Sequence, residues 1–254
     1  MNDPEPVRDS MKARLVRGEQ LLGALLRMPS EELTEMVALS GFDFVLIDCE
    51  HGPADLALLR NHIVLAACHD VDVMVRIGSG EPALALRALD QGAIGIVAPH
   101  VDTPEQAQAL VNSVHYPPLG HRGFATYSRA GQFGLVPPQE HRQRFLDETL
   151  VFAMIESPAA VAEAAAILDV PGLDGTMIGT ADLGASRRPD EPDVPELVGS
   201  VHAALAASRA LRMDIVPGAA QAEAALADGA DLVVYNLAHS IMGHLHELAA
   251  ARGT

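Results

Sequence analysis

The sequence predicts an α/β protein built as a (β/α)8 TIM barrel, and three observations support this fold. Short apolar runs alternate along the chain with amphipathic stretches rich in Ala and Leu. The apolar runs are nearly continuous, as in parallel strands that are covered on both faces. Eight strands with intervening helices in 254 residues is the stoichiometry of this barrel. We therefore expect one barrel domain over residues 1–254, which begins with a polar extension over residues 1–18.

The predicted strands are the eight short apolar runs. They are Leu21–Leu26, Phe44–Asp48, Val73–Ile77, Gly95–Ala98, Val151–Ile155, Thr176–Ile178, Met213–Val216 and Leu232–Tyr235. The rival architecture is an open doubly wound sheet, whose first strand is usually followed by the glycine pattern GxGxxG. Residues 24–30 contain no glycine, so the closed barrel is favoured.

Helix-start signals precede several of the amphipathic stretches. Thr103, for example, is an N-cap residue followed by Pro104 in the first turn. The predicted helices are Ser30–Leu39, Pro53–His69, Thr103–Val114, Pro158–Leu168, Pro195–Leu211, Ala219–Ala227 and His239–Ala251. A segment rich in Gly and Pro, residues 116–139, interrupts the alternation, and we expect it to be a long functional loop.

The composition excludes several classes of function. With 34 Asp+Glu against 17 Lys+Arg the formal charge is −17, which argues against nucleic acid as a partner. Lys12 is the single lysine, so a P-loop and a lysine Schiff base further along the chain are excluded. No apolar run has the roughly 18 residues of a membrane span, and the N-terminus lacks the apolar segment of a signal peptide. We expect a cytoplasmic protein without a membrane partner.

Four polar residues follow or end predicted strands, where the active sites of such barrels lie. They are His51, Arg76, Glu156 and Asp182, from the second, third, fifth and sixth strands. Two carboxylates suit Mg²⁺ or Mn²⁺, and such a cation polarises a carbonyl group and stabilises an enolate. A histidine carries protons near neutral pH, and an arginine binds an oxyanion. The set indicates proton abstraction beside a carbonyl group, or carbon–carbon cleavage through an enolate.

Each of these residues also has a purely structural interpretation. Glu156 precedes a helix start and would favour the helix dipole, Asp182 would serve as an N-cap, and Arg76 would pair with a buried acid. The coincidence of all four at strand ends favours a site.

Four stretches in the same order resemble the HpcH/HpaI aldolase family, the metal-dependent (class II) pyruvate aldolases that cleave 4-hydroxy-2-oxo acids. The similarity runs from about Leu22 to Ala238. The stretches are GFDFVLIDCEHGP at 41–53, LDQGA at 89–93 with IVAP at 96–99, YPPLGHRG at 116–123, and IE at 155–156 with GLDG at 172–175 and IGTADL at 178–183.

The resemblance implies a modified barrel, with its last helix exchanged between subunits of a homotrimer or hexamer. It implies a divalent metal ion, Mg²⁺, Mn²⁺ or Co²⁺, held by Glu156 and Asp182, and a 2-oxo acid and an aldehyde as substrates. His51 would be the base, with Asp90 orienting its imidazole, and Arg76 would steady the pyruvate oxygens.

The resemblance also implies a substrate-binding segment after the sixth strand. Backbone groups of Gly179, Thr180, Ala181 and Asp182 would bind the pyruvate carboxylate, and Arg122 would lie near the aldehyde half or a neighbouring subunit.

Some positions depart from the family pattern and indicate an altered substrate pocket. Thr180 replaces a proline, His100 stands where an apolar residue is usual, and Tyr235 with Asn236 replaces a Gly and an Asp after the last strand. Two alternatives therefore stay open. One is a lyase acting on an acyl-CoA or phosphorylated substrate, with arginines such as Arg122 as anion contacts. The other is a non-catalytic metal-binding barrel.

Overall fold

The computed structural model describes residues 9–52 and 55–251, and its strands close into an all-parallel barrel in sequence order, β1 to β8. Each strand pairs with the next, and β8 closes the barrel on β1. The strands are β1 (Leu21–Leu26), β2 (Phe44–Asp48), β3 (Asp72–Arg76), β4 (Gly95–Ala98), β5 (Leu150–Ile155), β6 (Gly175–Ile178), β7 (Leu211–Val216) and β8 (Leu232–Asn236). The predicted barrel fold is confirmed, with strand boundaries shifted by two residues at most.

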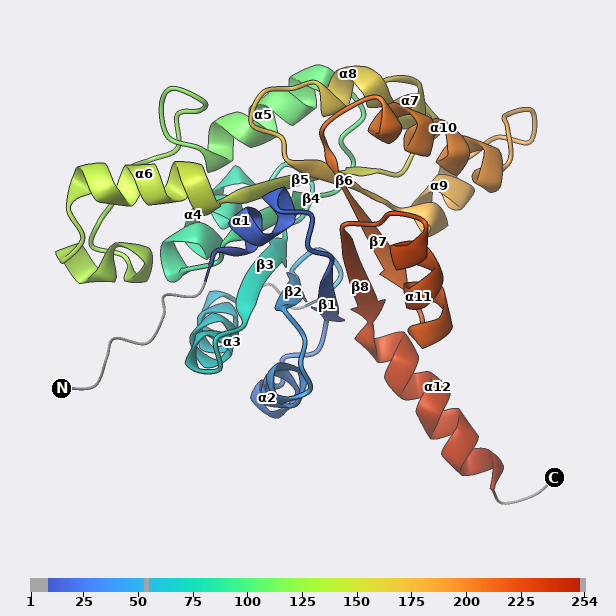
Figure 1. Ribbon diagram of the computed structural model, residues 1–254, viewed down its shortest axis with the longest axis horizontal. Helices are drawn as coiled ribbons and strands as arrows, with labels where there is room; N and C mark the ends of the chain where they lie inside the picture. Colours follow the sequence, from blue (N-terminus) through green and yellow to red (C-terminus); the bar gives the residue numbers. More distant parts are fainter. Residues whose placement is uncertain (1–8, 53–54, 252–254) are drawn as a thin grey trace.

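Helices surround the barrel (Figure 1). They are α1 (Met11–Val16), α2 (Glu31–Leu39), α3 (Leu56–Cys68), α4 (Pro82–Gln91), α5 (Pro104–Val114), the 3-10 helix η1 (Arg129–Gly134), α6 (Pro138–Glu148), α7 (Pro158–Ala162), α8 (Ala164–Leu168), α9 (Thr180–Ser186), α10 (Val194–Ala206), α11 (Ala219–Ala227) and α12 (Leu237–Ala250). All seven predicted helices are present, although the predicted 158–168 helix is split, and the first two residues predicted for α3, at 53–54, lie outside the described residues. The helix predicted to end at Leu211 ends at Ala206, and Leu211 is the first residue of β7. None of the helices in the described ranges is long and apolar enough to cross a membrane.

The sequence analysis missed α1, α4, α6 and α9. The sequence does contain start and stop signals for α4. Pro82 lies in its first turn, and Gly92, with φ of 107°, follows its last residue. The predicted loop over residues 116–139 contains η1, and its last two residues begin α6. The long irregular part of this segment is therefore shorter than expected.

The N-terminal extension is not only a polar tail. Its first eight residues lie outside the described part of the chain, but α1 places Met11 and Leu15 in the core inside the barrel. Lys12 Nζ lies 2.7 Å from Asp174 Oδ1 and donates to the carbonyl oxygen of Thr149 at 2.9 Å. This helix closes the N-terminal end of the barrel, which we call the floor.

Apolar residues pack in two layers, one inside the barrel and one, formed by three clusters, between its strands and the helices. Phe44 and Phe152 are fully buried in the inner core. Gly23 makes room for the ring of Phe44, because a Cβ at position 23 would lie 2.3 Å from it. The interior of the barrel is thus filled by side chains, and polar chemistry is confined to its ends.

A Gly-x-Asp sequence precedes three of the strands at the floor. In each case the glycine has a positive φ and the aspartate accepts a hydrogen bond from the backbone of the neighbouring strand. The glycines are Gly41 (φ 87°), Gly172 (φ 92°) and Gly229 (φ 91°). The bonds run from Leu22 N–H to Asp43 Oδ2 (2.9 Å), from Val151 N–H to Asp174 Oδ2 (2.8 Å) and from Arg212 N–H to Asp231 Oδ2 (2.8 Å).

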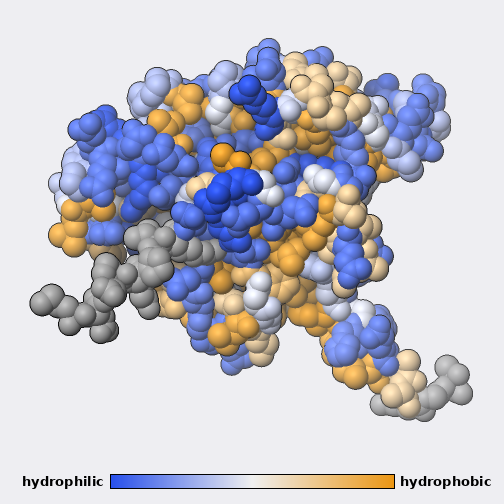
Figure 2. Space-filling model, viewed as in Figure 1, coloured by the Kyte–Doolittle hydropathy of each residue, from blue (hydrophilic) through white to orange (hydrophobic). Residues whose placement is uncertain are grey.

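The last helix, α12, projects away from the barrel (Figure 1) and contains no buried residue. Met242, Leu245 and Leu248 are each at least half exposed on it. Figure 2 shows apolar residues on this projecting segment beside polar ones. Exchange of α12 between subunits stays a prediction.

Candidate active site

A buried ion pair forms the base of the site at the C-terminal ends of β2 and β3. Asp48 and Arg76 are register partners at the last positions of these strands. Arg76 Nε donates to Asp48 Oδ1 at 2.9 Å, and Arg76 Nη2 donates to Asp48 Oδ2 at 2.6 Å. Arg27 Nε also donates to Asp48 Oδ2, at 2.8 Å. The bidentate geometry fixes the plane of the Arg76 guanidinium.

This pair keeps both groups charged inside the protein. Burial alone would raise the pKa of Asp48, but the hydrogen bond and charge of Arg76, with further bonds from the His51 backbone and Arg27, lower it below its usual value. Within residues 9–52 and 55–251, Arg76 Nη1 donates to the thioether of Met154, at 3.9 Å, which is a weak acceptor. One guanidinium nitrogen is therefore available to a substrate oxygen.

Glu50 links this ion pair to two histidines. Asp48 Oδ1 accepts the backbone N–H groups of Glu50 and His51, both at 3.2 Å, and so shapes the turn after β2. Glu50 Oε2 lies 3.3 Å from Arg76 Nε. Glu50 Oε1 lies 3.8 Å from His51 Nε2 and 3.7 Å from His100 Nε2. The turn thus brings His51 and Glu50 over the guanidinium.

Glu156 follows β5 and is held by His100, which follows β4. The His100 N–H donates to Glu156 Oε1 at 2.6 Å, and its ring Nδ1 lies 3.0 Å from the same oxygen. His100 has φ of 54°, the left-handed region that a non-glycine residue adopts at a cost and that is common at functional sites. Gly179 leaves space for the carboxylate, since a Cβ there would lie 2.5 Å from Glu156 Oε2.

Glu156 lies in a region with surplus negative charge. Burial raises its pKa, and the charges of Glu50 and Asp182 raise it further, while the bond and charge of His100 oppose this effect. Asp182 is exposed in the first turn of α9, beside Thr180 and Ala181. No three His, Cys, Asp or Glu side chains of the described chain converge closely enough to hold a metal ion by themselves.

The structure brings together His51, Arg76, Glu156 and Asp182 at this end of the barrel, which we call the rim. It does not bring Asp90 or Arg122 there. Asp90 lies at the end of α4, next to the start of β4 and therefore near the floor, and its Oδ1 accepts from Arg122 Nη2 at 2.5 Å. Within one chain no ion pair or hydrogen bond joins Asp90 to His51 among the described residues. The orienting role of Asp90 stays a prediction.

Arg122 is enclosed by aromatic residues instead of facing the rim. Its guanidinium carbon lies 5.0 Å from the ring centre of Tyr116 and 4.5 Å from that of Phe145. The side chain is fully buried, which suits a structural ion pair with Asp90. Its predicted contact with the substrate also stays a prediction.

The sequence analysis assigned no role to Glu50 or to Asp48, and noted His100 only as an unusual residue at its position. Glu50 and Asp48 lie in the DCEHG segment with His51, so a charged cluster after one strand was the available signal. The role of His100 depends on its left-handed backbone conformation, which cannot be predicted from the sequence.

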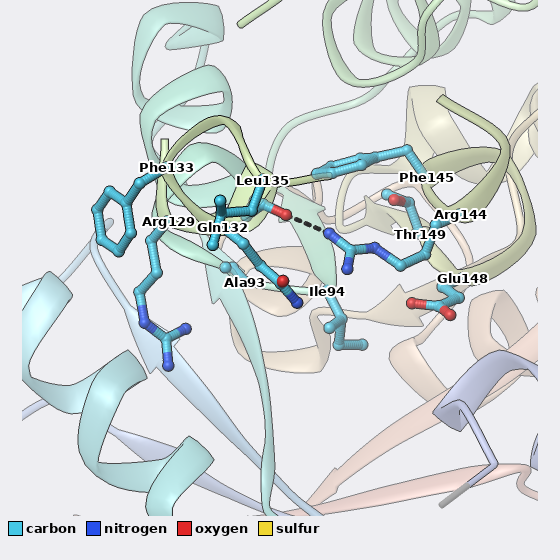
Figure 3. Close-up of a pocket in the computed structure, with 12 residues that line it drawn as sticks. Ala93, Ile94, Arg129, Gln132, Phe133, Leu135, Arg144, Phe145, Glu148 and Thr149 are labelled. Atoms are coloured by element: carbon cyan, nitrogen blue, oxygen red, sulfur yellow. Dashed lines mark hydrogen bonds between the residues drawn. The ribbon is translucent and has the colours of Figure 1, made fainter. Parts of the chain in front are cut away.

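Two pockets are relevant to the site. One, of 510 Å³, lies near the floor between η1, α6 and the start of β4, and Figure 3 shows Arg129, Arg144 and Glu148 lining it. A hydrogen bond from Arg144 Nη2 to the Ala130 carbonyl oxygen crosses that pocket. The second, of 380 Å³, borders His100 at the rim. The second adjoins the site through His100, whose ring contacts Glu156.

A model of one protein family matches residues 25–236, and its description is HpcH/HpaI aldolase/citrate lyase. The chain belongs to this family. It is 36% identical over 195 residues to a pyruvate aldolase of Rhizobium etli, which covers 76% of each chain. It is also 36% identical over 228 residues to a 2-keto-3-deoxy-L-rhamnonate aldolase of Klebsiella pneumoniae, which covers 87% of this chain and 84% of that protein.

Solved structures of the family agree with the barrel. A HpcH/HpaI aldolase/citrate lyase family protein from Burkholderia cenocepacia superposes with a TM-score of 0.87 at 28% identity, covering 96% of this chain and 99% of that one. The sequence-based assignment to the family is confirmed, and so is the prediction of an enzyme, a carbon–carbon lyase of the aldolase kind.

Proposed function

We propose that the protein is a divalent-metal-dependent aldolase that cleaves or forms 4-hydroxy-2-oxo acids through the enolate of pyruvate. The observation that carries this proposal is the convergence of Glu156, Glu50 and Asp182 beside the fixed guanidinium of Arg76 and the half-exposed imidazole of His51. The names of relatives, a pyruvate aldolase and a hydroxypyruvate/pyruvate aldolase among them, support pyruvate as the oxo-acid half.

The residues fit a hard divalent cation such as Mg²⁺, Mn²⁺ or Co²⁺. Glu156 and Asp182 supply carboxylate oxygens, and burial, followed by the charges of Glu50 and Asp182, raises the pKa of Glu156. Water and substrate oxygens would complete the coordination. When bound, the cation would act as a Lewis acid that polarises the keto group of the 2-oxo acid.

The protein residues would then divide the remaining work. Arg76 Nη1 would donate to an oxygen of pyruvate, while Asp48 holds the rest of the guanidinium in place. His51 would accept or return the proton at the reacting carbon or hydroxyl group. The first-turn N–H groups of α9, at Thr180, Ala181 and Asp182, lack partners within their helix and would bind the pyruvate carboxylate, next to Gly179.

The experiment that tests this function is proton NMR of pyruvate in D₂O. With protein and Mn²⁺ or Mg²⁺ present, we expect the methyl signal to disappear as deuterium replaces its protons. With a chelator the signal should persist. Exchange that survives complete metal removal would overturn the proposed metal dependence, and no exchange with metal demonstrably bound would favour a non-catalytic barrel.

We also propose a homo-oligomer, trimer or hexamer, of cytoplasmic location. The exposed Met242, Leu245 and Leu248 of α12, which bury nothing in their own chain, support exchange of this helix between subunits. Light scattering should give a mass of at least three chains, and deletion of residues 237–254 should reduce it. A stable full-length monomer would overturn this assembly.

A further inference from the structure

The 380 Å³ pocket at the rim lies outside the cluster of Glu50, Arg76 and Glu156. Its walls come from the loop between β3 and α4, the end of β4, and α5. The lining residues are Ile77, Ser79, Gly80, Glu81, Pro82, Ala98, Pro99, His100, Val101, Gln106, Ala109, Leu110 and Ser113. This volume is in the range that small-molecule sites commonly have, about 300–1,000 Å³.

His100 connects the pocket to the reacting groups. Its ring contacts Glu156 Oε1 at 3.0 Å and lies 3.7 Å from Glu50, and the same residue lines the pocket. Half of its side chain is exposed. A substrate whose pyruvate half lies over Glu156 and Arg76 can therefore extend past His100 into the pocket.

The lining of the pocket selects against negative charge. It contains no lysine or arginine, and its one carboxylate, Glu81, accepts the N–H of Gly78 at 3.1 Å. Most other lining residues are apolar, with Ala109 and Leu110 of α5 on one wall. A phosphate, sulfonate or carboxylate in this pocket would lose its hydration without gaining a lysine or arginine partner from the lining.

A few polar groups remain for an uncharged oxygen. Gln106 Oε1 accepts the backbone N–H groups of Asp102 and Thr103, at 2.6 and 3.2 Å, which orients its amide nitrogen away from the helix start. That nitrogen and the hydroxyl group of Ser79 can bond a hydroxyl or carbonyl oxygen.

We propose that this pocket is the subsite for the aldehyde-derived half of the substrate, and that it takes a short, uncharged and mainly apolar chain. The inference rests on the proposed aldolase function and names its substrate class. A substrate with an anionic distal group, as in the phosphorylated or acyl-CoA alternatives, would fit this pocket poorly.

Filling the pocket tests the inference. Ala109→Phe places a ring in the pocket from an exposed position on α5, and Glu105→Phe, on the same helix but outside the lining, is the matched control. Each protein is assayed in the aldol direction with pyruvate and acetaldehyde, hexanal or succinic semialdehyde, and separately for exchange of the pyruvate methyl protons. Ser113→Leu fills the same pocket from a second position, should the first variant be unstable.

The wild type should prefer hexanal to succinic semialdehyde by at least about 10-fold in kcat/KM. Ala109→Phe should lower kcat/KM for hexanal by about 10-fold or more, and leave acetaldehyde addition and methyl exchange within about twofold. Unchanged use of hexanal by both filled variants would overturn the inference, as would a preference for the carboxylated aldehyde. Absence of methyl exchange in the wild type would instead overturn the proposed function itself.

Discussion

The two ends of the barrel use the same kinds of charged residue in different ways. At the floor, two of the three aspartates of the Gly-x-Asp sequences, Asp43 and Asp174, have both oxygens occupied. Asp43 binds a backbone N–H with Oδ2 and Arg14 of α1 with Oδ1, at 2.8 Å, and Asp174 does the same with Lys12. In both aspartates one oxygen is paired with a cation of α1 and the other with a backbone N–H, so the same arrangement occurs twice.

At the rim no such repeat exists, and acids exceed bases. Asp48 accepts hydrogen bonds from Arg76 and Arg27, and Glu50 contacts the same Arg76 guanidinium. Glu156 accepts the N–H of His100, and burial together with the charges of Glu50 and Asp182 raises its pKa. The rim thus holds unbalanced charge in a fixed geometry, whereas the Gly-x-Asp sequences of the floor use their aspartates in paired, structural contacts.

Removing the imidazole of His51 should give the largest effect on function and almost none on stability. His51→Asn should lower the rate of pyruvate methyl exchange by about 10²- to 10⁴-fold, the usual contribution of a general base. The side chain is 54% exposed, so the urea midpoint should stay at the wild-type value. His244→Asn, on exposed α12, is the control. Full exchange activity in His51→Asn would show that the base lies elsewhere.

Replacing Arg76 tests whether one residue at the rim contributes both to stability and to activity. Arg76→Met leaves the buried carboxylate of Asp48 with Arg27 alone, and we expect about 3 kcal/mol less unfolding free energy together with lost exchange. Urea unfolding measures the first effect. Arg188→Met, at an exposed position, should change neither. Adding Asp48→Leu to Arg76→Met should restore part of the lost stability but not exchange, since the buried carboxylate of Asp48 is then no longer left without Arg76.

The floor should show the opposite result. Asp231→Ala leaves the Arg212 N–H without its acceptor, and this should lower the unfolding free energy by about 1–3 kcal/mol. Methyl exchange should stay within a factor of about two, because the change lies at the far end of the barrel. Asp190→Ala on an exposed loop is the matched control. A loss of exchange in folded Asp231→Ala would break the division between floor and rim.

This division also explains what the sequence predicts and what it does not. The barrel follows from local signals, because buried parallel strands are continuous apolar runs. His51, Arg76, Glu156 and Asp182 are predictable as strand-end residues, since the topology brings those ends together. Each of these inferences needs only a position relative to a strand.

The remaining features depend on three-dimensional contacts. The sequence of α1 has no clear apolar pattern, because Met11 and Leu15 alone in this short helix pack inside the barrel. The pairing of Asp90 with Arg122 joins residues that are 32 positions apart through a loop without a periodic pattern. His100 reaches Glu156 only because its backbone is left-handed, a choice fixed by tertiary structure.

The smallest effect concerns His115, a buried residue near Asp174 at the floor. Burial lowers its pKa, although the charge of Asp174 opposes this, and its Nε2–H donates to the Gly172 carbonyl oxygen at 3.2 Å. Above pH about 6.5 the ring is neutral in both folded and unfolded chains. Below this pH, His115 is protonated in the unfolded chain but stays neutral in the folded chain. The free energy of unfolding therefore falls as the pH falls toward the pKa of His115 in the folded state.

Replacing this ring should flatten that dependence. We expect His115→Gln to reduce the slope of unfolding free energy between pH 7 and pH 5.5 by up to about 1.4 kcal/mol per pH unit, the value for one proton. Urea unfolding at several pH values gives the slope. His244→Gln removes an exposed histidine and should leave it unchanged. Equal slopes for the wild type and His115→Gln would mean that the floor tolerates a charged His115, and that its balance of charge is less strict than its hydrogen bonds indicate.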